Sequence, residues 1–188
     1  MTEIADRIKT IEDNISSACS RASRSPEEAK IIVVTKTAPV ESIKEVIKLG
    51  YTNLGENRVQ HLKQVAAQIS EFLTAEKNNP AVPDSVNWHM IGHLQRNKVR
   101  QVLKLSSFVH SVDTLRLAEE LCERAQKLSV TPRILLQVNC SEEPQKYGVP
   151  VGAAIHLAEQ LVTMKNIKLA GLMTMAPLTL NKDIVRAC

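Results

Sequence analysis

The chain has 188 residues, of which 44% are hydrophobic and 23% are charged, and its formal net charge is +4. This composition is typical of a globular protein with one substantial core and excludes a disordered or fibrous chain. No apolar run approaches the roughly 20 residues of a membrane-spanning helix, and the acidic start lacks the apolar region of a signal peptide, so we expect a cytoplasmic protein.

The cysteines and the net charge suggest neither a metal site nor a nucleic-acid partner. The four cysteines, Cys19, Cys122, Cys140 and Cys188, form no C-x-x-C pair and do not stand at zinc-finger spacing from a histidine. We therefore expect free or buried thiols. A charge of +4 is only weakly basic and does not by itself indicate nucleic-acid binding.

The apolar pattern switches repeatedly between helical and extended periods along the chain. It begins with an amphipathic helix near residues 2–22, followed by a capping box at 25–28. The expected strands cover residues 30–36, 53–56, 87–92, 108–112, 133–139 and 169–174. The expected helices between them cover residues 39–49, 58–73, 95–105, 114–128 and 151–164. Gly50 is expected to end the first of these helices, and Asp113 can cap the fourth.

The alternation of strands and helices predicts an α/β fold in one domain spanning residues 1–188. Short connections without a hairpin signal indicate parallel strands with helices outside them. A (β/α)8 TIM-type barrel and an open doubly wound sheet both fit, although no G-x-G-x-x-G motif follows the first strand. The count is six strand–helix units, whereas a closed barrel needs eight.

Lys36 is the residue most suggestive of chemistry. It ends the apolar run that begins at Ile31, which indicates a fully buried strand, and Pro39 then opens a helix. Enzymes of this fold class place their chemistry where a strand gives way to a helix. An amine there can form a Schiff base with a carbonyl compound, whereas the simpler interpretation is a lysine pointing into solvent.

Polar residues also follow the other five strands, and in a parallel barrel all of them lie on one rim. This convergence favours a site over six unrelated loops. The residues are Glu56 and Asn57, His93–Asn97, Ser111 and Asp113, Asn139–Lys146, and Thr174. The rim holds no evident catalytic set, because H-x-x-x-H, paired carboxylates at helical spacing and G-x-S-x-G are all absent. A reactive amine with few acid or base companions suits the holding of a carbonyl cofactor.

Six segments spread in order from residue 33 to residue 175 carry a family resemblance. They are VVTKT (33–37), LGENRVQ (54–60), WHMIGHLQRNK (88–98), HSVD (110–113), QVN (137–139) with KYG (146–148), and LAGLMTM (169–175). The GENRVQ and WHMIGHLQRNK strings together are highly specific, and with them the chain resembles the pyridoxal 5′-phosphate homeostasis protein family.

The resemblance implies a barrel like the N-terminal domain of alanine racemases, a cofactor and a set of residues that bind it. Lys36 is expected to carry pyridoxal phosphate as an internal aldimine, in a protein that buffers or delivers the cofactor without established catalysis. Asn57, His89 and Ser111 are expected to line the ring pocket, and Lys146 to lie near its mouth and take part in cofactor transfer. The implied partners are the cofactor and the apo-enzymes that use it, with no nucleic acid or membrane, and a monomer is expected.

Three other functions stay open from the residues. A racemase- or decarboxylase-like enzyme would need a second acid or base on the opposite face of the cofactor ring. A Schiff-base aldolase would need a carboxylate beside Lys36, and we identify none. Nucleic-acid binding would use Arg96, Lys98, Arg100 and Lys104, but stacking aromatic residues are absent there.

Members of the resembled family continue past residue 188, into an S-x-G-M-S segment and an R-I-G segment that bind the cofactor phosphate. Without them the outer strands keep open edges, and several charge-assisted hydrogen bonds of about 1.5–3 kcal/mol each are missing. We therefore expect these 188 residues to bind pyridoxal phosphate weakly or to fold only marginally. Spectrophotometric titration with the cofactor checks this, and a stable adduct band with sub-micromolar affinity would contradict it.

Overall fold

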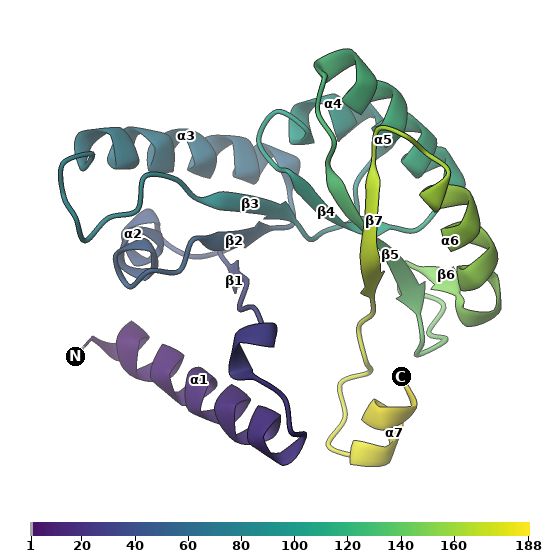
Figure 1. Cartoon of the computed structure of the whole chain (residues 1–188), viewed down its shortest axis with the longest axis horizontal. Helices are drawn as coiled ribbons and strands as arrows, with labels where there is room; N and C mark the ends of the chain where they lie inside the picture. The colour runs from purple at the N-terminus through teal and green to yellow at the C-terminus, as the bar shows by residue number, and fades with distance from the viewer. Residues whose placement is uncertain (1) are drawn as a thin grey trace. The chain divides into compact units, whose positions relative to one another are not determined.

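The structure is a computed structural model that describes residues 2–188, and it divides into two compact units (Figure 1). Unit 1 consists of the residues up to Gly55 together with Lys63–Asn87, and unit 2 consists of Glu56–Leu62 together with Trp88–Cys188. In both units strands pair in parallel and alternate with helices. The expected α/β class is therefore confirmed, whereas the single-domain expectation stays a prediction.

Unit 1 contains the first helices and a short parallel strand pair. Strand β1 pairs with β2 through Val33 opposite Leu54. Apolar side chains of α2, α3 and β2 form the core of this unit, including the fully buried Ile47, Leu54 and Ile69. The elements that lie wholly or mostly in this unit are α1 (Glu3–Arg21), η1 (Pro26–Glu28), β1 (Val33–Val34), α2 (Val40–Lys48), β2 (Asn53–Glu56) and α3 (Val59–Ala75), whose first turn belongs to unit 2.

Two of the expected turn signals in unit 1 are confirmed. Ser25 and Glu28 form a reciprocal capping box around η1, with Pro26 at its first position. Gly50 follows the end of α2 with φ of +92°, a conformation that residues with a Cβ rarely adopt, and its N–H donates to the Ile47 carbonyl at 2.9 Å.

Strand β1 differs from the expected buried strand over residues 30–36. Only Val33 and Val34 have strand geometry, and the Val34 side chain is 48% exposed. A short β-branched run indicates extended backbone, but it does not reveal whether both faces of the strand are covered. The expectation of full burial was therefore wrong.

Unit 2 is built around strand β5 (Arg133–Asn139). This strand pairs in parallel with β4 (Phe108–Val112) and with β7 (Lys168–Met173), and its last two residues pair with β6 (Val149–Pro150). Strand β3 (Asn87–Met90) pairs with β4 through His89 opposite Phe108. In the described residues, neither unit closes its strands into a complete barrel.

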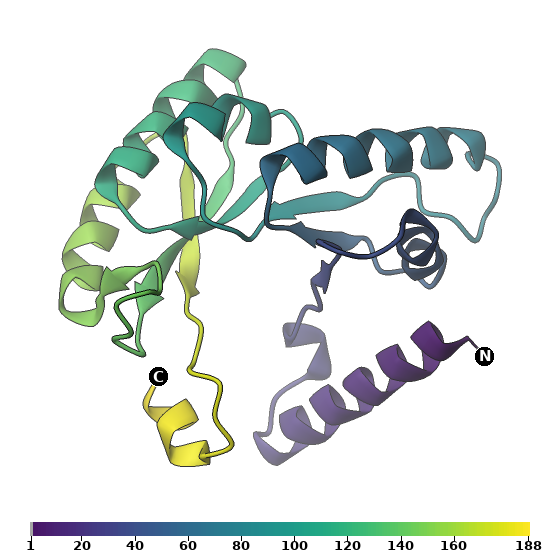
Figure 2. The ribbon, with the colours of Figure 1, turned by 180° about the vertical axis from the view of Figure 1, so that it is seen from behind.

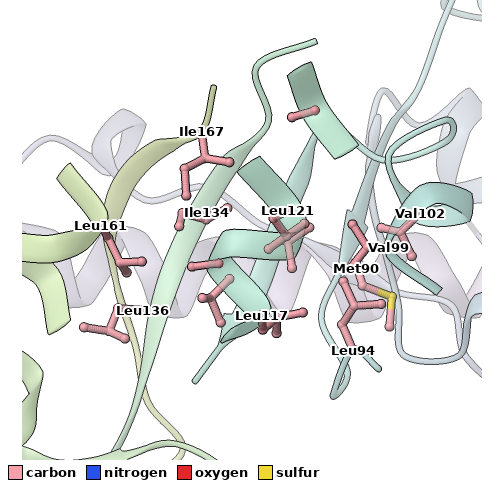
Figure 3. Close-up of a cluster of buried hydrophobic side chains, with 14 of the residues drawn as sticks. Met90, Leu94, Val99, Val102, Leu117, Leu121, Ile134, Leu136, Leu161 and Ile167 are labelled. Carbon is pink, nitrogen blue, oxygen red and sulfur yellow. The ribbon is translucent and has the colours of Figure 1, made fainter. Parts of the chain in front are cut away.

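Helices of unit 2 lie along one face of these strands (Figures 1 and 2). These helices are η2 (Arg96–Lys98), α4 (Val99–Val102), α5 (Leu115–Leu128), η3 (Val151–Ala153) and α6 (Ala154–Val162). The short helix α7 (Lys182–Ala187) lies beyond the end of β7 and does not cover this face. Between helices and strands is a continuous aliphatic core (Figure 3). In it Leu117 and Leu121 of α5 meet Ile134 and Leu136 of β5, and all four are at most 2% exposed. On β5, Gln137 and Asn139 alternate with these core residues and lie on the opposite face of the strand.

Three details of unit 2 depart from the expected elements. The helix expected over 95–105 is a 3₁₀ turn followed by the single helical turn of α4, and the two-residue strand β6 was not expected. The cap of α5 is Thr114, whose hydroxyl accepts a hydrogen bond from the Leu117 N–H at 3.3 Å. The assignment of Asp113 as this cap was wrong by one residue, because Asp and Thr are both good caps and only the backbone decides between them.

None of the helices within residues 2–188 combines the length and the apolar character that crossing a membrane requires.

Helix α6 offers a direct test of the core of unit 2. Leu161 is fully buried and Ile155, on the same helix, is 76% exposed. Leu161→Ala is expected to lower the free energy of unfolding by about 2–5 kcal/mol, because it removes buried methyl groups and leaves a cavity. Urea denaturation measures this loss, and Ile155→Ala, which removes the same number of carbon atoms, is the control. Equal losses in both variants would contradict the described core.

Candidate functional site

Lys36 lies in unit 1, two residues after the end of strand β1, and its side chain is exposed. The backbone before it is fixed, because the N–H of the buried Thr35 donates to the Gly55 carbonyl at 3.0 Å and extends the β1–β2 pairing. Within residues 2–188 the Lys36 amine has no ion pair and no hydrogen bond. The amine is therefore accessible and not neutralised by a carboxylate.

Asn57, Gly92 and Ser111 form a contact in unit 2 where the chain leaves β2, β3 and β4. A Cβ built on Gly92 would stand 2.2 Å from the Asn57 carbonyl oxygen, so only glycine allows the two backbones to approach this closely. The buried Ser111 hydroxyl donates to the Gly92 carbonyl at 2.6 Å. The structure thus brings together two of the predicted ring-pocket residues, Asn57 and Ser111, through a glycine that links them.

Glu56, the residue before Asn57, links the segments that form this contact. Its side chain is fully buried, and Oε2 lies 2.8 Å from Nδ1 of His61. The Glu56 carbonyl accepts a hydrogen bond from the Ile91 N–H at 2.9 Å. Asn57 and Gly92 are the next residues along the chain, so this bond holds their two segments side by side.

His89, the third predicted ring-pocket residue, lies in a different cluster of unit 2. Its Nδ1 is 2.9 Å from Nε2 of His110, and its ring lies 5.3 Å from that of Phe108. The Arg133 guanidinium lies over the Phe108 ring at 4.6 Å. Burial first, and then the charges of His110 and Arg133, lower the pKa of His89 to about 4. Burial and Arg133 also lower the pKa of His110, so both rings are neutral near neutral pH.

The loop after β5, residues 140–148, is fastened to the strand by side-chain amides. Gln137 donates to the Tyr147 carbonyl at 3.0 Å, and Asn139 donates to the Glu143 carbonyl at 3.0 Å. Gly148 has φ of +128°, and a Cβ there would stand 2.7 Å from the Asn139 backbone nitrogen. These contacts fix the positions from which Lys146 and Tyr147 extend.

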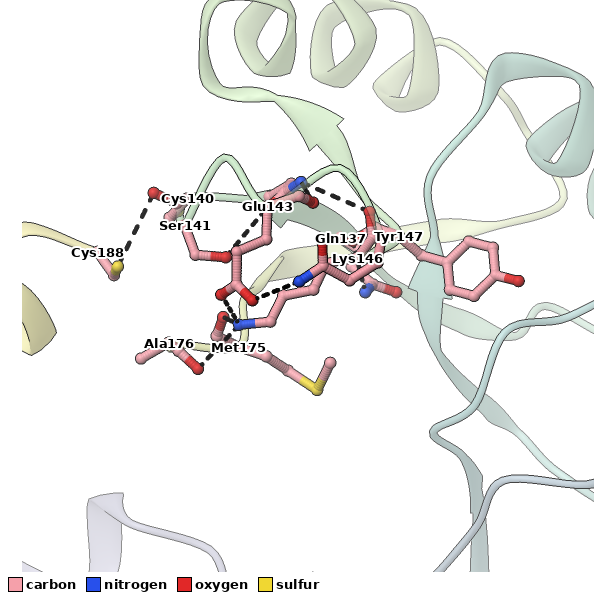
Figure 4. A network of polar contacts seen from close by, with 11 residues as sticks. Gln137, Cys140, Ser141, Glu143, Lys146, Tyr147, Met175, Ala176 and Cys188 are labelled. Carbon is pink, nitrogen blue, oxygen red and sulfur yellow. Dashed lines mark hydrogen bonds and ion pairs between the residues drawn. The ribbon is translucent and has the colours of Figure 1, made fainter. Parts of the chain in front are cut away.

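Lys146 is paired, in contrast to Lys36 (Figure 4). Its amine lies 2.5 Å from the Glu143 carboxylate and donates to the carbonyl oxygens of Met175 at 3.4 Å and Ala176 at 3.2 Å. The hydrogen bond from Lys146 contributes most to lowering the pKa of Glu143. Lys146 therefore joins the loop after β5 to the segment that follows β7.

Sequence reasoning did not identify a second polar group in unit 2, made of His93, Asp113 and Tyr147. The rings of His93 and Tyr147 are stacked, with centroids 3.9 Å apart and planes 12° from parallel. Oδ2 of the buried Asp113 lies 3.6 Å from Nδ1 of His93. The pattern of polar residues after strands included His93 and Asp113 but ended at Lys146, one residue before Tyr147. No sequence signal pairs a residue after β3 with one after β5.

The predicted site residues thus fall into separate groups. Asn57 and Ser111 meet through Gly92, His89 pairs with His110, Lys146 pairs with Glu143, and Lys36 belongs to unit 1. In the part of the chain that the structure describes, no three side chains of histidine, cysteine, aspartate or glutamate gather as metal ligands.

Comparison with known proteins places the chain among relatives of similar fold. Residues 7–185 match the family model described as alanine racemase, N-terminal domain. A pyridoxal phosphate homeostasis protein of Aquifex aeolicus is 36% identical over 182 residues, which are 96% of this chain and 74% of that protein. The protein of the same name from Escherichia coli K12 is 32% identical over 173 residues, 92% of this chain and 70% of that protein.

Solved structures agree with this placement. A crystal structure of an unknown protein from Bifidobacterium adolescentis has a TM-score of 0.88 and 32% identity over 98% of this chain and 74% of that one. PipY of Synechococcus elongatus, solved with pyridoxal phosphate bound, has a TM-score of 0.74 and 30% identity over 92% of this chain and 75% of that one. An alanine racemase of Clostridium difficile shares the fold, with a TM-score of 0.66 and 16% identity over 97% of this chain and 44% of that one. The expected likeness to the racemase N-terminal domain is confirmed.

The pair of His89 and His110 predicts acid sensitivity of unit 2. The unfolded chain protonates His89 near its ordinary pKa of 6.5, whereas the folded chain does so only near 4. The folded state therefore keeps its full stability above about pH 6.5 and loses the contribution of His89 as the pH falls towards 4. Urea denaturation at several pH values measures this loss.

The variant His89→Gln is expected to lose less stability between pH 6.5 and 4 than the natural chain, because it has no ring to protonate there. His156→Gln, at an exposed histidine of α6, is the control and is expected to follow the natural chain. An unchanged pH profile in His89→Gln would contradict the buried neutral pair.

Proposed function

The chain belongs to the pyridoxal phosphate homeostasis protein family, and on that premise we propose that it binds pyridoxal 5′-phosphate and keeps or delivers the cofactor without catalysis of its own. The observation that carries the proposal is its 36% identity to the Aquifex aeolicus relative over nearly the whole chain. The pyridoxal phosphate bound to PipY, a structural neighbour at 30% identity, supports the same cofactor.

Lys36 is the residue that we propose holds the cofactor covalently. When bound, the cofactor supplies an aldehyde that condenses with a primary amine. The exposed and unpaired amine of Lys36 suits this role, since a lysine engaged with a carboxylate would first have to break that pair. Lys146 is engaged in this way with Glu143 and is the less suitable of the two.

Asn57 and Ser111 are proposed to line the pocket of the cofactor ring, and their closeness in the structure supports this. Because Gly92 has no side chain, the Asn57 backbone packs directly against it, and Ser111 bonds to the same glycine. The Ser111 hydroxyl, which donates to Gly92, can still accept a hydrogen bond. His89 is proposed to contribute a neutral ring from the neighbouring strand β3, since its pKa is lowered to about 4.

Lys146 is proposed to take part in handing the cofactor to apo-enzymes in the cytoplasm. Its amine binds the Met175 and Ala176 carbonyls, so it can release or hold the segment after β7. In a transfer assay that measures recovered activity of an apo-enzyme, Lys146→Ala is expected to change the rate of transfer while leaving the adduct at Lys36. An unchanged rate would remove Lys146 from this role.

A racemase-like enzyme is the alternative function. The likeness to the Clostridium difficile alanine racemase, at 16% identity, supports a common fold and carries no argument for its reaction. Racemase turnover that is lost in Lys36→Ala would favour the enzyme over the carrier.

Trapping with borohydride tests the role of Lys36. Protein mixed with excess pyridoxal phosphate and reduced with sodium borohydride is expected to carry the reduced cofactor at Lys36, as located by peptide mass spectrometry. Because reduction makes the bond irreversible, product accumulates even where reversible binding is weak.

The matched control is Lys30→Ala, which removes another exposed lysine of the same segment. Lys36→Ala is expected to abolish the labelled peptide, whereas Lys30→Ala is expected to leave it unchanged. Equal labelling of many lysines, with no preference for Lys36, would show that the chain holds the cofactor at no specific amine.

A further inference from the structure

An open cleft of about 720 Å³ lies in unit 2, and its lining includes none of the residues proposed above for the cofactor, although Tyr147 directly follows Lys146. It is formed by the segment after β3, the first turn of α5 and Tyr147. Its volume is within the range of small-molecule sites. The polar and aromatic residues that matter for the argument are His93, Arg96, Asn97, Asp113, Arg116 and Tyr147.

Two guanidinium groups on this cleft are unpaired. Arg96 and Arg116 are exposed, and within residues 2–188 neither forms an ion pair or a hydrogen bond with a carboxylate. Helix α5 begins beside Arg116, after Thr114, and the N–H groups of a helix's first turn have no acceptor inside the helix. The Thr114 hydroxyl accepts from the Leu117 N–H, so the N–H groups of Leu115 and Arg116 are the ones left for an anion. Guanidinium groups and a helix start together favour a phosphate or carboxylate.

An aromatic surface stands beside the arginines. Tyr147 stacks on His93 with one face and is 56% exposed, so part of its ring is open to the cleft. Its backbone is held by the bond from Gln137, so the ring extends from a fixed point. A rigid exposed ring of this kind stacks with planar heteroaromatic groups.

A buried acceptor completes the cleft. Asp113 is 9% exposed, and its Oδ1 accepts no hydrogen bond from any described residue. Leaving a buried carboxylate oxygen unmatched is unfavourable, so a donor from a ligand would be bound well here. Oδ2 of the same carboxylate faces His93 at 3.6 Å, which orients both groups.

We propose that this cleft binds the phosphate monoester of a planar, hydroxyl-bearing heteroaromatic compound, with nucleoside monophosphates as the class that it suits best. The phosphate lies between Arg96 and Arg116, the ring stacks on Tyr147, and a hydroxyl or amine donates to Asp113. Asn97 supplies an amide for the edge of the ring. The site is independent of the cofactor bound through Lys36.

Calorimetric titration of the full chain tests the proposal with four compounds: adenosine monophosphate, adenosine, inorganic phosphate and pyridoxine 5′-phosphate. Adenosine monophosphate is expected to bind more tightly than adenosine or phosphate alone, because it contacts both the two arginines and the Tyr147 ring. Pyridoxine 5′-phosphate has no aldehyde and cannot bond to Lys36. Weaker binding of this compound than of the nucleotide is therefore expected, and tighter binding would contradict the assignment of the cleft to nucleotides.

Variants locate the binding. Arg116→Gln and Tyr147→Ala are each expected to lower the affinity for adenosine monophosphate about tenfold. The first removes a charge-assisted hydrogen bond to the phosphate, and the second removes the stacking on the base. Arg100→Gln, at an exposed arginine outside the cleft, is the matched control, and thermal unfolding verifies that each variant is folded. Lys36→Ala is expected to keep full nucleotide binding. This variant therefore tests nucleotide binding separately from cofactor binding at Lys36.

Two further results would overturn the inference. One is binding of adenosine monophosphate no tighter than that of inorganic phosphate. The other is binding that is lost in Lys36→Ala or unaffected in both Arg116→Gln and Tyr147→Ala.

Discussion

The backbone pairing of strand β5 is the interaction on which unit 2 depends. This strand bonds to β4 and β7 along its length and to β6 at its end. Because side chains alternate along a strand, Ile134, Leu136 and Val138 enter the core while Gln137 and Asn139 face the other way. The amides of Gln137 and Asn139 donate to carbonyls of the following loop. One strand therefore contributes side chains to the core and also holds the loop that carries Lys146 and Tyr147.

The long helices and most strands could be predicted because their apolar patterns extend over several residues. Helix α5, for example, buries Leu117, Leu121 and Ala125 at helical spacing, and this spacing is visible in the sequence. Strand β6 has two residues and therefore no period, and the 3₁₀ turn η2 has three. Their form follows from tertiary pairing that no local pattern encodes.

The candidate site was predictable only in part for a similar reason. The rule that polar residues follow parallel strands pointed to Asn57 and Ser111, and both lie beside Gly92. The rule cannot say which side chains pair across strands. It missed the stacking of His93 on Tyr147, and it could not distinguish the paired amine of Lys146 from the unpaired amine of Lys36.

The ion pair of Lys146 determines how the contact between the loop after β5 and the segment after β7 responds to salt. Its ion pair with Glu143 is short, at 2.5 Å, and the two side chains are only 20% and 32% exposed. Dissolved ions screen such a pair weakly, whereas they screen exposed charges well. The loop after β5 should therefore stay joined to the segment after β7 at any physiological ionic strength, while the exposed guanidinium groups of Arg96 and Arg116 lose their attraction for anions as salt increases.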